Sequence, residues 1–280
     1  MNLSVVIITF NEEANIARTL ASVKRLVTDS QGEIIVVDSG STDRTVEIAK
    51  SFGAKVFVEE WKGFAAQKNS AIDKAEGTWI LSLDADEELD SDLQRALAEL
   101  LDSLARLSAL GRPQDSRTGA ASDPGSIPHA DFDGLFIPRK NEFLGRWIRH
   151  GGYWPDPKLR LFRRGKGGFE NRAVHEDVQV EGITRQIQSG AILHHSYPTL
   201  SDYIEHMNRY SSLGAEMVVA KGPARLTAVN ITLRPLATFL YNYFFRFGFL
   251  DGREGFLLHA IHAVYVAWKY AKAWELSRRQ

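Results

Sequence analysis

Four short segments rich in valine and isoleucine occur in the first third of the chain, and they constrain its fold more than any other feature. They cover residues 4–10, 33–38, 55–58 and 79–84. Continuous apolar runs of this length are typical of strands buried on both faces of a parallel sheet. The intervening residues 12–27, 42–52 and 65–76 carry apolar side chains at helical spacing. The alternation predicts an α/β fold, a Rossmann-like doubly wound sheet with helices on both faces.

Polar side chains stand where three of these predicted strands end. Asn11, Asp38 and Asp84 occupy those positions. Ligands of open α/β sheets bind at the carboxyl ends of the strands, so we expect the site there. The chain contains neither G-x-G-x-x-G nor G-x-x-x-x-G-K-[ST]. The dinucleotide fingerprint and the P-loop therefore do not explain this sheet.

The middle of the chain changes character twice. A predicted helix over 90–107 is followed by 108–131, which is dominated by Ser, Gly, Ala, Pro and Asp and predicts a mobile loop. Extended segments at 134–137, 159–162, 174–180 and 191–195 then predict mixed or antiparallel strands that complete the sheet. A helix is expected over 201–221. We therefore expect one domain over 1–220 and a separate helical region over 221–280.

The chain has no cysteine. This excludes disulfides, a zinc–thiolate site and a thiol nucleophile, so the chemistry must come from carboxylates, histidines or bound ions. Met1-Asn2-Leu3 leads directly into an apolar strand without a basic leader. This start predicts a cytoplasmic protein rather than a secreted one.

The sequence Asp84-Ala85-Asp86 ends a predicted buried strand. Two carboxylates there need a cation or hydrogen-bond donors to offset the loss of water. Mg²⁺ and Mn²⁺ prefer oxygen ligands and commonly take one or two carboxylates together with phosphate oxygens. The D-x-D pattern thus predicts a metal–diphosphate site, with an acidic helix-capping loop as the alternative.

A second polar turn follows the strand that ends at Asp38. Gly40 permits a tight turn, and the Asp38 carboxylate can accept hydrogen bonds from a base or a ribose. The alternative is an ordinary strand-to-helix turn.

The chain resembles the family 2 inverting glycosyltransferases, and within them it is closest to bacterial lipopolysaccharide-core β-glycosyltransferases. The resemblance rests on Thr9-Phe10-Asn11-Glu12-Glu13, Val37-Asp38-Ser39-Gly40-Ser41-Thr42-Asp43, Trp61-Lys62-Gly63-Phe64-Ala65-Ala66-Gln67-Lys68-Asn69, Leu83-Asp84-Ala85-Asp86, Val174-His175-Glu176-Asp177 and Ile192-Leu193-His194-His195-Ser196-Tyr197. It implies the GT-A fold and a nucleoside-diphosphate sugar as donor, with UDP favoured.

The resemblance also assigns the donor site. It implies a nucleotide lined by Thr9, Asn11, Glu12 and Asp38. Asp84 would approach the ribose and Asp86 would bind Mn²⁺ or Mg²⁺. Lys68 would meet uracil or phosphate, with a solvated surface charge as the alternative.

An inverting transfer needs a base that takes the proton of the acceptor hydroxyl. The resemblance places this role on Glu176, with Asp177 as the alternative, because neighbours on a strand point to opposite faces. An exposed acidic pair in a turn is the other interpretation. The resemblance also implies that His194, rather than His195, completes the metal shell, although a single histidine is more often structural.

The last sixty residues are basic and aromatic. Residues 221–280 have a net charge of +6, which leaves −7 for residues 1–220. The apolar runs 236–245 and 256–268 are shorter than the roughly 20 residues that span a bilayer. They favour amphipathic helices lying on an anionic membrane surface. The alternative is a pair of helices that pack on the body or in a dimer.

Together these features predict a metal-dependent transferase that moves a hexose, from UDP-glucose or a similar donor, to the lipopolysaccharide core or another glycan or lipid-linked acceptor. We expect it at the inner face of the cytoplasmic membrane and expect no nucleic-acid partner. The alternatives are transfer to a polyprenyl phosphate, which needs no strong base, and a non-catalytic nucleotide-sugar-binding scaffold.

Overall fold

The computed structural model describes residues 2–109, 132–170 and 177–279. They form two compact units, and each is described by itself. The first unit comprises Met1–Arg139 and Pro157–His194, and the second comprises Lys140–Asp156 and His195–Gln280. The second unit thus begins earlier in the chain than the predicted boundary after residue 220. The functional division at that boundary stays a prediction.

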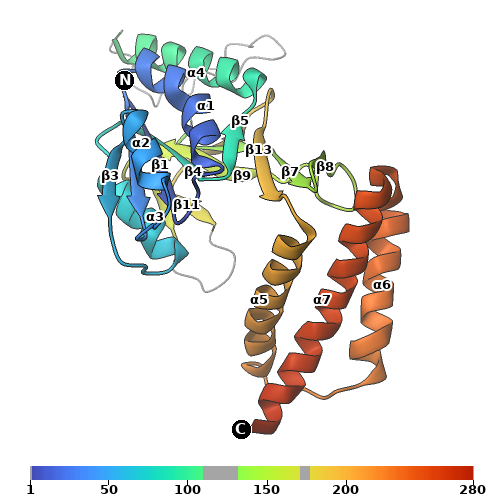
Figure 1. Ribbon diagram of the computed structural model, residues 1–280. Coiled ribbons are helices and arrows are strands. Elements are labelled where there is room, and N and C mark those ends of the chain that lie inside the picture. The colour runs from blue at the N-terminus through green and yellow to red at the C-terminus, as the bar shows by residue number, and fades with distance from the viewer. Residues whose placement is uncertain (1, 110–131, 171–176, 280) are drawn as a thin grey trace. The chain divides into compact units, whose positions relative to one another are not determined.

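A seven-stranded sheet in the order β12-β6-β9-β4-β1-β2-β3 forms the centre of the first unit (Figure 1). Its strands are β1 (Leu3–Thr9), β2 (Glu33–Asp38), β3 (Lys55–Val58), β4 (Trp79–Asp84), β6 (Gly134–Ile137), β9 (Lys158–Arg163) and β12 (Thr184–Gln186). Strand β1 pairs in parallel with β2 and β4, and β2 pairs in parallel with β3. Strand β9 runs antiparallel to both β4 and β6. The predicted mixed α/β sheet is confirmed.

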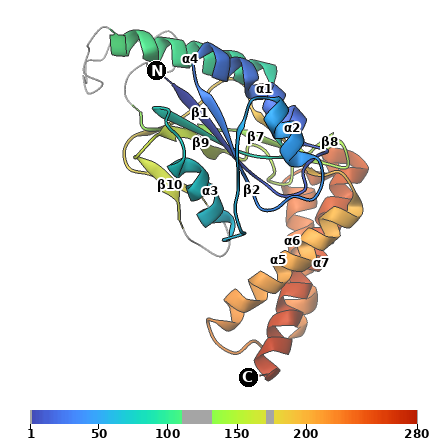
Figure 2. The same ribbon diagram turned by 60° about the vertical axis from the view of Figure 1, so that its left-hand side comes forward.

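Helices cover both faces of this sheet, as Figures 1 and 2 show. They are α1 (Ile16–Asp29), α2 (Thr45–Ser51), α3 (Phe64–Asp73) and α4 (Ser91–Ala109). Alternate residues of β1 enter different cores: Val5 joins the cluster that contains Leu20 of α1 and Leu97 of α4, whereas Val6 joins the cluster that contains Ile72 of α3. This is the two-residue period of a strand buried on both faces.

Two short strand pairs complete the first unit. Strand β5 (Glu87–Leu89) pairs antiparallel with the first half of β13 (Ile192–Tyr197), which sets His194 opposite Glu87. Strand β10 (Gly167–Phe169) pairs antiparallel with β11 (Val178–Val180). The predicted loop at 108–131 lies almost wholly outside the described residues.

The second unit is mainly helical. It contains most of the hairpin β7 (Arg139–Phe143) and β8 (Arg146–Trp147), and the helices α5 (Leu200–Val219), η1 (Val229–Leu233), α6 (Arg234–Leu240), η2 (Tyr241–Phe245), η3 (Gly248–Asp251) and α7 (Gly252–Arg279). Both α5 and α6 pack against α7. Among the described residues, no helix is long and apolar enough to cross a membrane. The predicted C-terminal helical region is confirmed.

His259 of α7 is buried without a polar partner. Its side chain is 1% exposed, and neither ring nitrogen has a hydrogen-bond partner among the described residues. The ring packs so closely on Gly151 and Gly248 that a Cβ at either position would lie within 2.4 Å of it. Burial lowers the pKa of His259 from 6.5 to about 4, and the positive charge of Arg246 acts in the same direction. The folded second unit therefore holds this imidazole neutral.

This burial predicts a stability that depends on pH. The pKa of His259 is lower in the folded state than in the unfolded state. The contribution of His259 to the unfolding free energy is therefore complete above pH 6.5 and is lost as the pH falls towards 4. Between pH 7.5 and pH 5, wild type should lose about 2 kcal/mol more unfolding free energy than His259→Gln, whose side chain does not titrate. Denaturant unfolding at both pH values measures this difference, and parallel pH curves for the two proteins would contradict it.

Candidate active site

The carboxylate of Asp84, at the end of β4, is held between two cations. Lys68 Nζ lies 2.7 Å from Oδ1, and the Arg160 guanidinium donates to Oδ2 at 2.9 Å. Burial alone would raise the pKa of Asp84, but Lys68 and Arg160 hold it well below its usual range. Lys68 is itself buried and lies over the Phe169 ring, so it is not a solvated surface charge. Its contact with the nucleotide stays a prediction.

Glu87 is a site residue that the sequence analysis did not identify. Its side chain is 0% exposed. It accepts hydrogen bonds from Arg160 at 2.6 Å, from Arg139 at 3.2 Å and from the backbone N–H of Asp84 at 3.0 Å. Burial opposes the charge on Arg160, but Glu87 and Asp84 raise the pKa of that guanidinium above its usual value. Glu87 thus fixes the backbone and the cations of the D-x-D turn.

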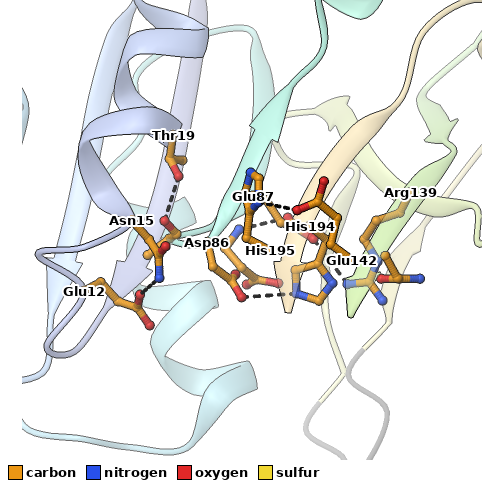
Figure 3. Close-up of polar contacts among 12 residues, drawn as sticks. Glu12, Asn15, Thr19, Asp86, Glu87, Arg139, Glu142, His194 and His195 are labelled. Atoms are coloured by element: carbon orange, nitrogen blue, oxygen red, sulfur yellow. Dashed lines mark hydrogen bonds and ion pairs between the residues drawn. The ribbon is translucent and has the colours of Figure 1, made fainter. Parts of the chain in front are cut away.

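The second carboxylate of the D-x-D motif faces a histidine from another strand (Figure 3). Asp86 Oδ2 lies 3.2 Å from His194 Nε2. Burial would raise the pKa of Asp86, but His194 keeps it below its usual value. The next residue, His195, instead pairs with Glu142 in the second unit, with 2.7 Å between Nδ1 and Oε2. Adjacent histidines therefore have different partners, as strand alternation requires.

The pair formed by Asp86 and His194 fits a divalent cation whose other ligands are phosphate oxygens of the nucleotide and water. No group of three or more His, Asp or Glu side chains suited to a metal gathers within the described part of the chain. Both oxygens of Asp84 contact cationic side chains, whereas one oxygen of Asp86 contacts His194. Mg²⁺ and Mn²⁺ commonly use one or two protein oxygens and complete their shell with phosphate oxygens and water. Two protein donors suffice for that arrangement.

Two loops at the carboxyl edge of the sheet are joined by hydrogen bonds. Asn11, whose φ of 53° is left-handed, donates its backbone N–H to Ser41 Oγ at 2.8 Å. Its side-chain oxygen accepts from the Thr42 N–H at 2.8 Å. The Glu12 N–H donates to Thr45 Oγ1 at 2.7 Å. Asn11 therefore joins the loops after β1 and β2.

Asp38 and Thr9 end β2 and β1, as expected, but they are buried there. The Asp38 carboxylate accepts from the N–H groups of Gly40 and Ser41, each at 2.8 Å, and from the Ser41 hydroxyl. The Thr9 hydroxyl has no partner among the described residues. Asp38 thus shapes the turn, and its contact with a base or ribose stays a prediction.

The carboxyl group of Glu12 has a raised pKa. Burial raises this pKa, and the negative charges of Asp86, Asp43 and Asp84 act in the same direction, against a hydrogen bond from Asn15. The edge of the sheet near Glu12 is therefore a region of concentrated negative charge, which a cation would relieve.

The residues predicted to act as the base stand at the edge of a segment that the structure does not describe. Glu176 belongs to residues 171–176, outside the described residues, whereas Asp177 is described and exposed. The strand before that segment is anchored, because Asn69 Nδ2 donates to the Phe169 carbonyl and the Phe169 N–H donates to Asn69 Oδ1, both at 2.9 Å. The role of Glu176 stays a prediction.

The buried network makes a prediction about stability. Glu87→Gln keeps the shape of the side chain but removes the buried negative charge that pairs with Arg139 and Arg160. We expect the unfolding free energy to fall by about 3 kcal/mol, the usual effect of breaking a buried ion pair. Glu99→Gln, on the exposed face of α4, is the matched control and should change it by less than about 0.5 kcal/mol. Equal denaturation midpoints for the two variants would contradict the proposed importance of Glu87.

Comparisons with known proteins agree on one family. Residues 4–165 match the family model described as "Glycosyl transferase family 2". The chain is 31% identical over 284 residues to the lipopolysaccharide core biosynthesis glycosyltransferase LpsC of Rhizobium meliloti, covering 98% of this chain and 92% of that protein. It is 32% identical over 283 residues to an uncharacterized glycosyltransferase of Rickettsia typhi, covering 98% of this chain and 87% of the relative.

A solved structure supports the fold. The mannosyltransferase PcManGT from Pyrobaculum calidifontis, determined in complex with GDP-Man and Mn²⁺, superposes with a TM-score of 0.53 at 16% identity. The match covers 97% of this chain and 86% of that one. At this identity the likeness concerns the fold, which agrees with the GT-A architecture expected from the sequence.

Proposed function

We propose, from the premise that this chain belongs to glycosyltransferase family 2, that it moves a hexose with inversion from a nucleoside-diphosphate sugar to a lipopolysaccharide-core or other glycan or lipid-linked acceptor. UDP-glucose or a similar UDP-sugar is the proposed donor. The observation that carries the proposal is the pairing of Asp86 with His194 beside an Asp84 that two cations keep ionised. The similarity to LpsC over 98% of the chain supports the acceptor class.

The donor is proposed to bind along the carboxyl edge of β1, β2 and β4. Asn11 and Glu12 lie there, next to the turn shaped by Asp38, and their backbone N–H groups join the loop after β1 to the loop after β2. Asp84, held anionic by Lys68 and Arg160, is suited to accept hydrogen bonds from ribose hydroxyls.

Asp86 and His194 would hold Mn²⁺ or Mg²⁺. When bound, such an ion stabilises the negative charge on the departing nucleoside diphosphate. Asp84 and Glu87 contribute by fixing the turn, because the Asp84 N–H is hydrogen bonded to Glu87. A preorganised turn lowers the reorganisation needed when donor binds.

The proton of the attacking hydroxyl is proposed to pass to the carboxylate of Glu176, with Asp177 as the alternative. A carboxylate beyond the D-x-D motif is needed because Asp84 and Asp86 are engaged at the donor. We propose that the enzyme meets its acceptor at an anionic membrane surface inside the cell.

The metal assignment predicts a conditional loss of donor binding. In Asp86→Ala, binding of UDP-sugars should weaken at least tenfold in Mn²⁺ but equal that of wild type in EDTA, because only the ion-dependent part is removed. Calorimetry with UDP-, GDP- and dTDP-sugars, with and without Mn²⁺, measures the donor affinity and shows which nucleotide the protein prefers. Asp92→Ala, on the exposed start of α4, is the control. Undiminished Mn²⁺-dependent binding by Asp86→Ala would refute the metal assignment.

The assignment of Glu176 as catalytic base predicts a loss of transfer without a loss of donor binding. Glu176→Gln should retain donor affinity and lose transfer by several orders of magnitude, because the proton acceptor is neutralised without a change of shape. Asp177→Asn, the neighbouring isosteric change, should retain transfer. If Asp177→Asn loses transfer and Glu176→Gln does not, the roles are exchanged. If both retain it, an acceptor phosphate that needs no strong base is favoured.

A further inference from the structure

An apolar stripe runs along the exposed side of one continuous helical run in the second unit. We define the apolar stripe as Val229, Leu233, Leu236, Leu240 and Phe244 of η1, α6 and η2. Their exposed fractions lie between 39% and 56%. They recur every third or fourth residue, which places them on one face of a helix. A helix of a globular protein normally turns such a face inwards.

The opposite face of this helical run is already occupied. Pro235 is buried, and Phe239 and Tyr243 stack at 5.1 Å and each make an edge contact with Phe256 of α7. Figure 1 shows α6 alongside α7. The stripe is therefore a second apolar face, directed away from the partner helix.

The stripe continues into an exposed turn between η2 and α7. We define the aromatic tip as Phe245, Phe247, Phe249 and Leu250, whose exposed fractions are 75%, 56%, 42% and 52%. Contiguous apolar patches of this kind are rare on soluble monomers and mark binding surfaces. Phenylalanine and leucine are also side chains with which interfacial helices enter the boundary between headgroups and acyl chains.

The charges around the tip have one sign at the surface. The acid Asp251 is buried and accepts from the N–H groups of Arg149 and His150 at 3.1 and 2.8 Å. Glu254 lies 3.5 Å from Arg146. Arg253 is exposed, and residues 228–250 contain two arginines and no acid. Asp251 is thus buried and Glu254 is paired with an arginine, whereas Arg253 is exposed.

We propose that the apolar stripe and the aromatic tip dock on an anionic lipid bilayer, with the helical run from Val229 to Phe245 lying in the plane of the headgroups. Among the described residues no helix is suited to crossing the membrane, so this run is proposed to lie on its surface. Its apolar side enters the acyl boundary, while Arg253 meets lipid phosphates. The inference deepens the proposed membrane location and does not depend on the transfer chemistry.

A second copy of the chain is a poorer occupant. In a symmetric dimer the same surface meets itself, so the exposed Arg253 residues and the arginine-bearing tips would be brought together. No exposed acid in residues 228–250 offsets this repulsion. An anionic bilayer matches both the apolar stripe and its basic border.

Vesicle flotation of the full chain tests the proposal. Leu236→Ser/Leu240→Ser/Phe244→Ser should bind vesicles of phosphatidylcholine with 30% phosphatidylglycerol at least tenfold more weakly than wild type. The matched control Ile204→Ser/Met217→Ser/Val264→Ser alters residues of similar exposure on α5 and α7 and should bind within twofold of wild type. Arg253→Gln should bind anionic vesicles about fivefold more weakly and phosphatidylcholine vesicles unchanged. Equal binding by both triple variants overturns the proposal.

Insertion can be measured directly, because the chain has no cysteine and accepts a single label. An environment-sensitive dye on Phe245→Cys should shift to the blue with vesicles and be quenched by lipids labelled in the acyl chain, whereas a dye on Met217→Cys should not. A blue shift without vesicles that grows with protein concentration, together with a dimer in light scattering, would assign the surface to self-association and overturn the proposal. Mn²⁺-dependent donor binding, measured on the same variants, should stay at the wild-type level. If the wild-type protein itself shows no Mn²⁺-dependent donor binding, that result counts against the proposed function and not against the membrane surface.

Discussion

Buried charge at the end of β4 is the constraint around which the first unit is organised. Asp84 and Glu87 lie there, and an unpaired buried carboxylate destabilises a fold by several kcal/mol. Arg160 contacts both carboxylates, Lys68 contacts the first and Arg139 contacts the second. Arg160 comes from β9, which runs antiparallel to β4. The antiparallel strand therefore does more than extend the sheet, since it delivers a buried cation that contacts both acids at the carboxyl end of β4.

This network separates the two acids of the D-x-D motif. Asp84 is directed to buried cations, whereas Asp86, two residues later, faces His194 from β13. The separation depends on β5, a strand of three residues whose Glu87 anchors the turn and whose pairing with β13 sets the histidine opposite it. A motif that looks symmetric in sequence thus provides one carboxylate that pairs with two cations and one that pairs with a histidine.

The sequence predicted those parts of the molecule that follow from local pattern. The apolar strands, the helices between them and the polar residues at the strand ends have short-range signals, and the described segments confirm them. Glu87 had no such signal, because a glutamate in an acidic run suggests solvent, and its cations come from positions 52 and 73 residues away. Lys68 illustrates the same difficulty, since its burial depends on Asp84 and Phe169, which only the folded sheet brings near.

The C-terminal region is a second case in which the sequence does not predict which side chains are buried. Apolar residues occur all around the helical run that contains Leu236 to Phe245, so its sequence alone does not tell an inward face from an outward one. Packing on α7 distinguishes the two faces, because Phe239 and Tyr243 contact Phe256 of α7 whereas Leu240 and Phe244 stay exposed. The boundary between the units falls between His194 and His195, whose Cα atoms are about 3.8 Å apart in any trans peptide. His194, which pairs with Asp86, and His195, which pairs with Glu142, are thus neighbours on β13 although they belong to different units.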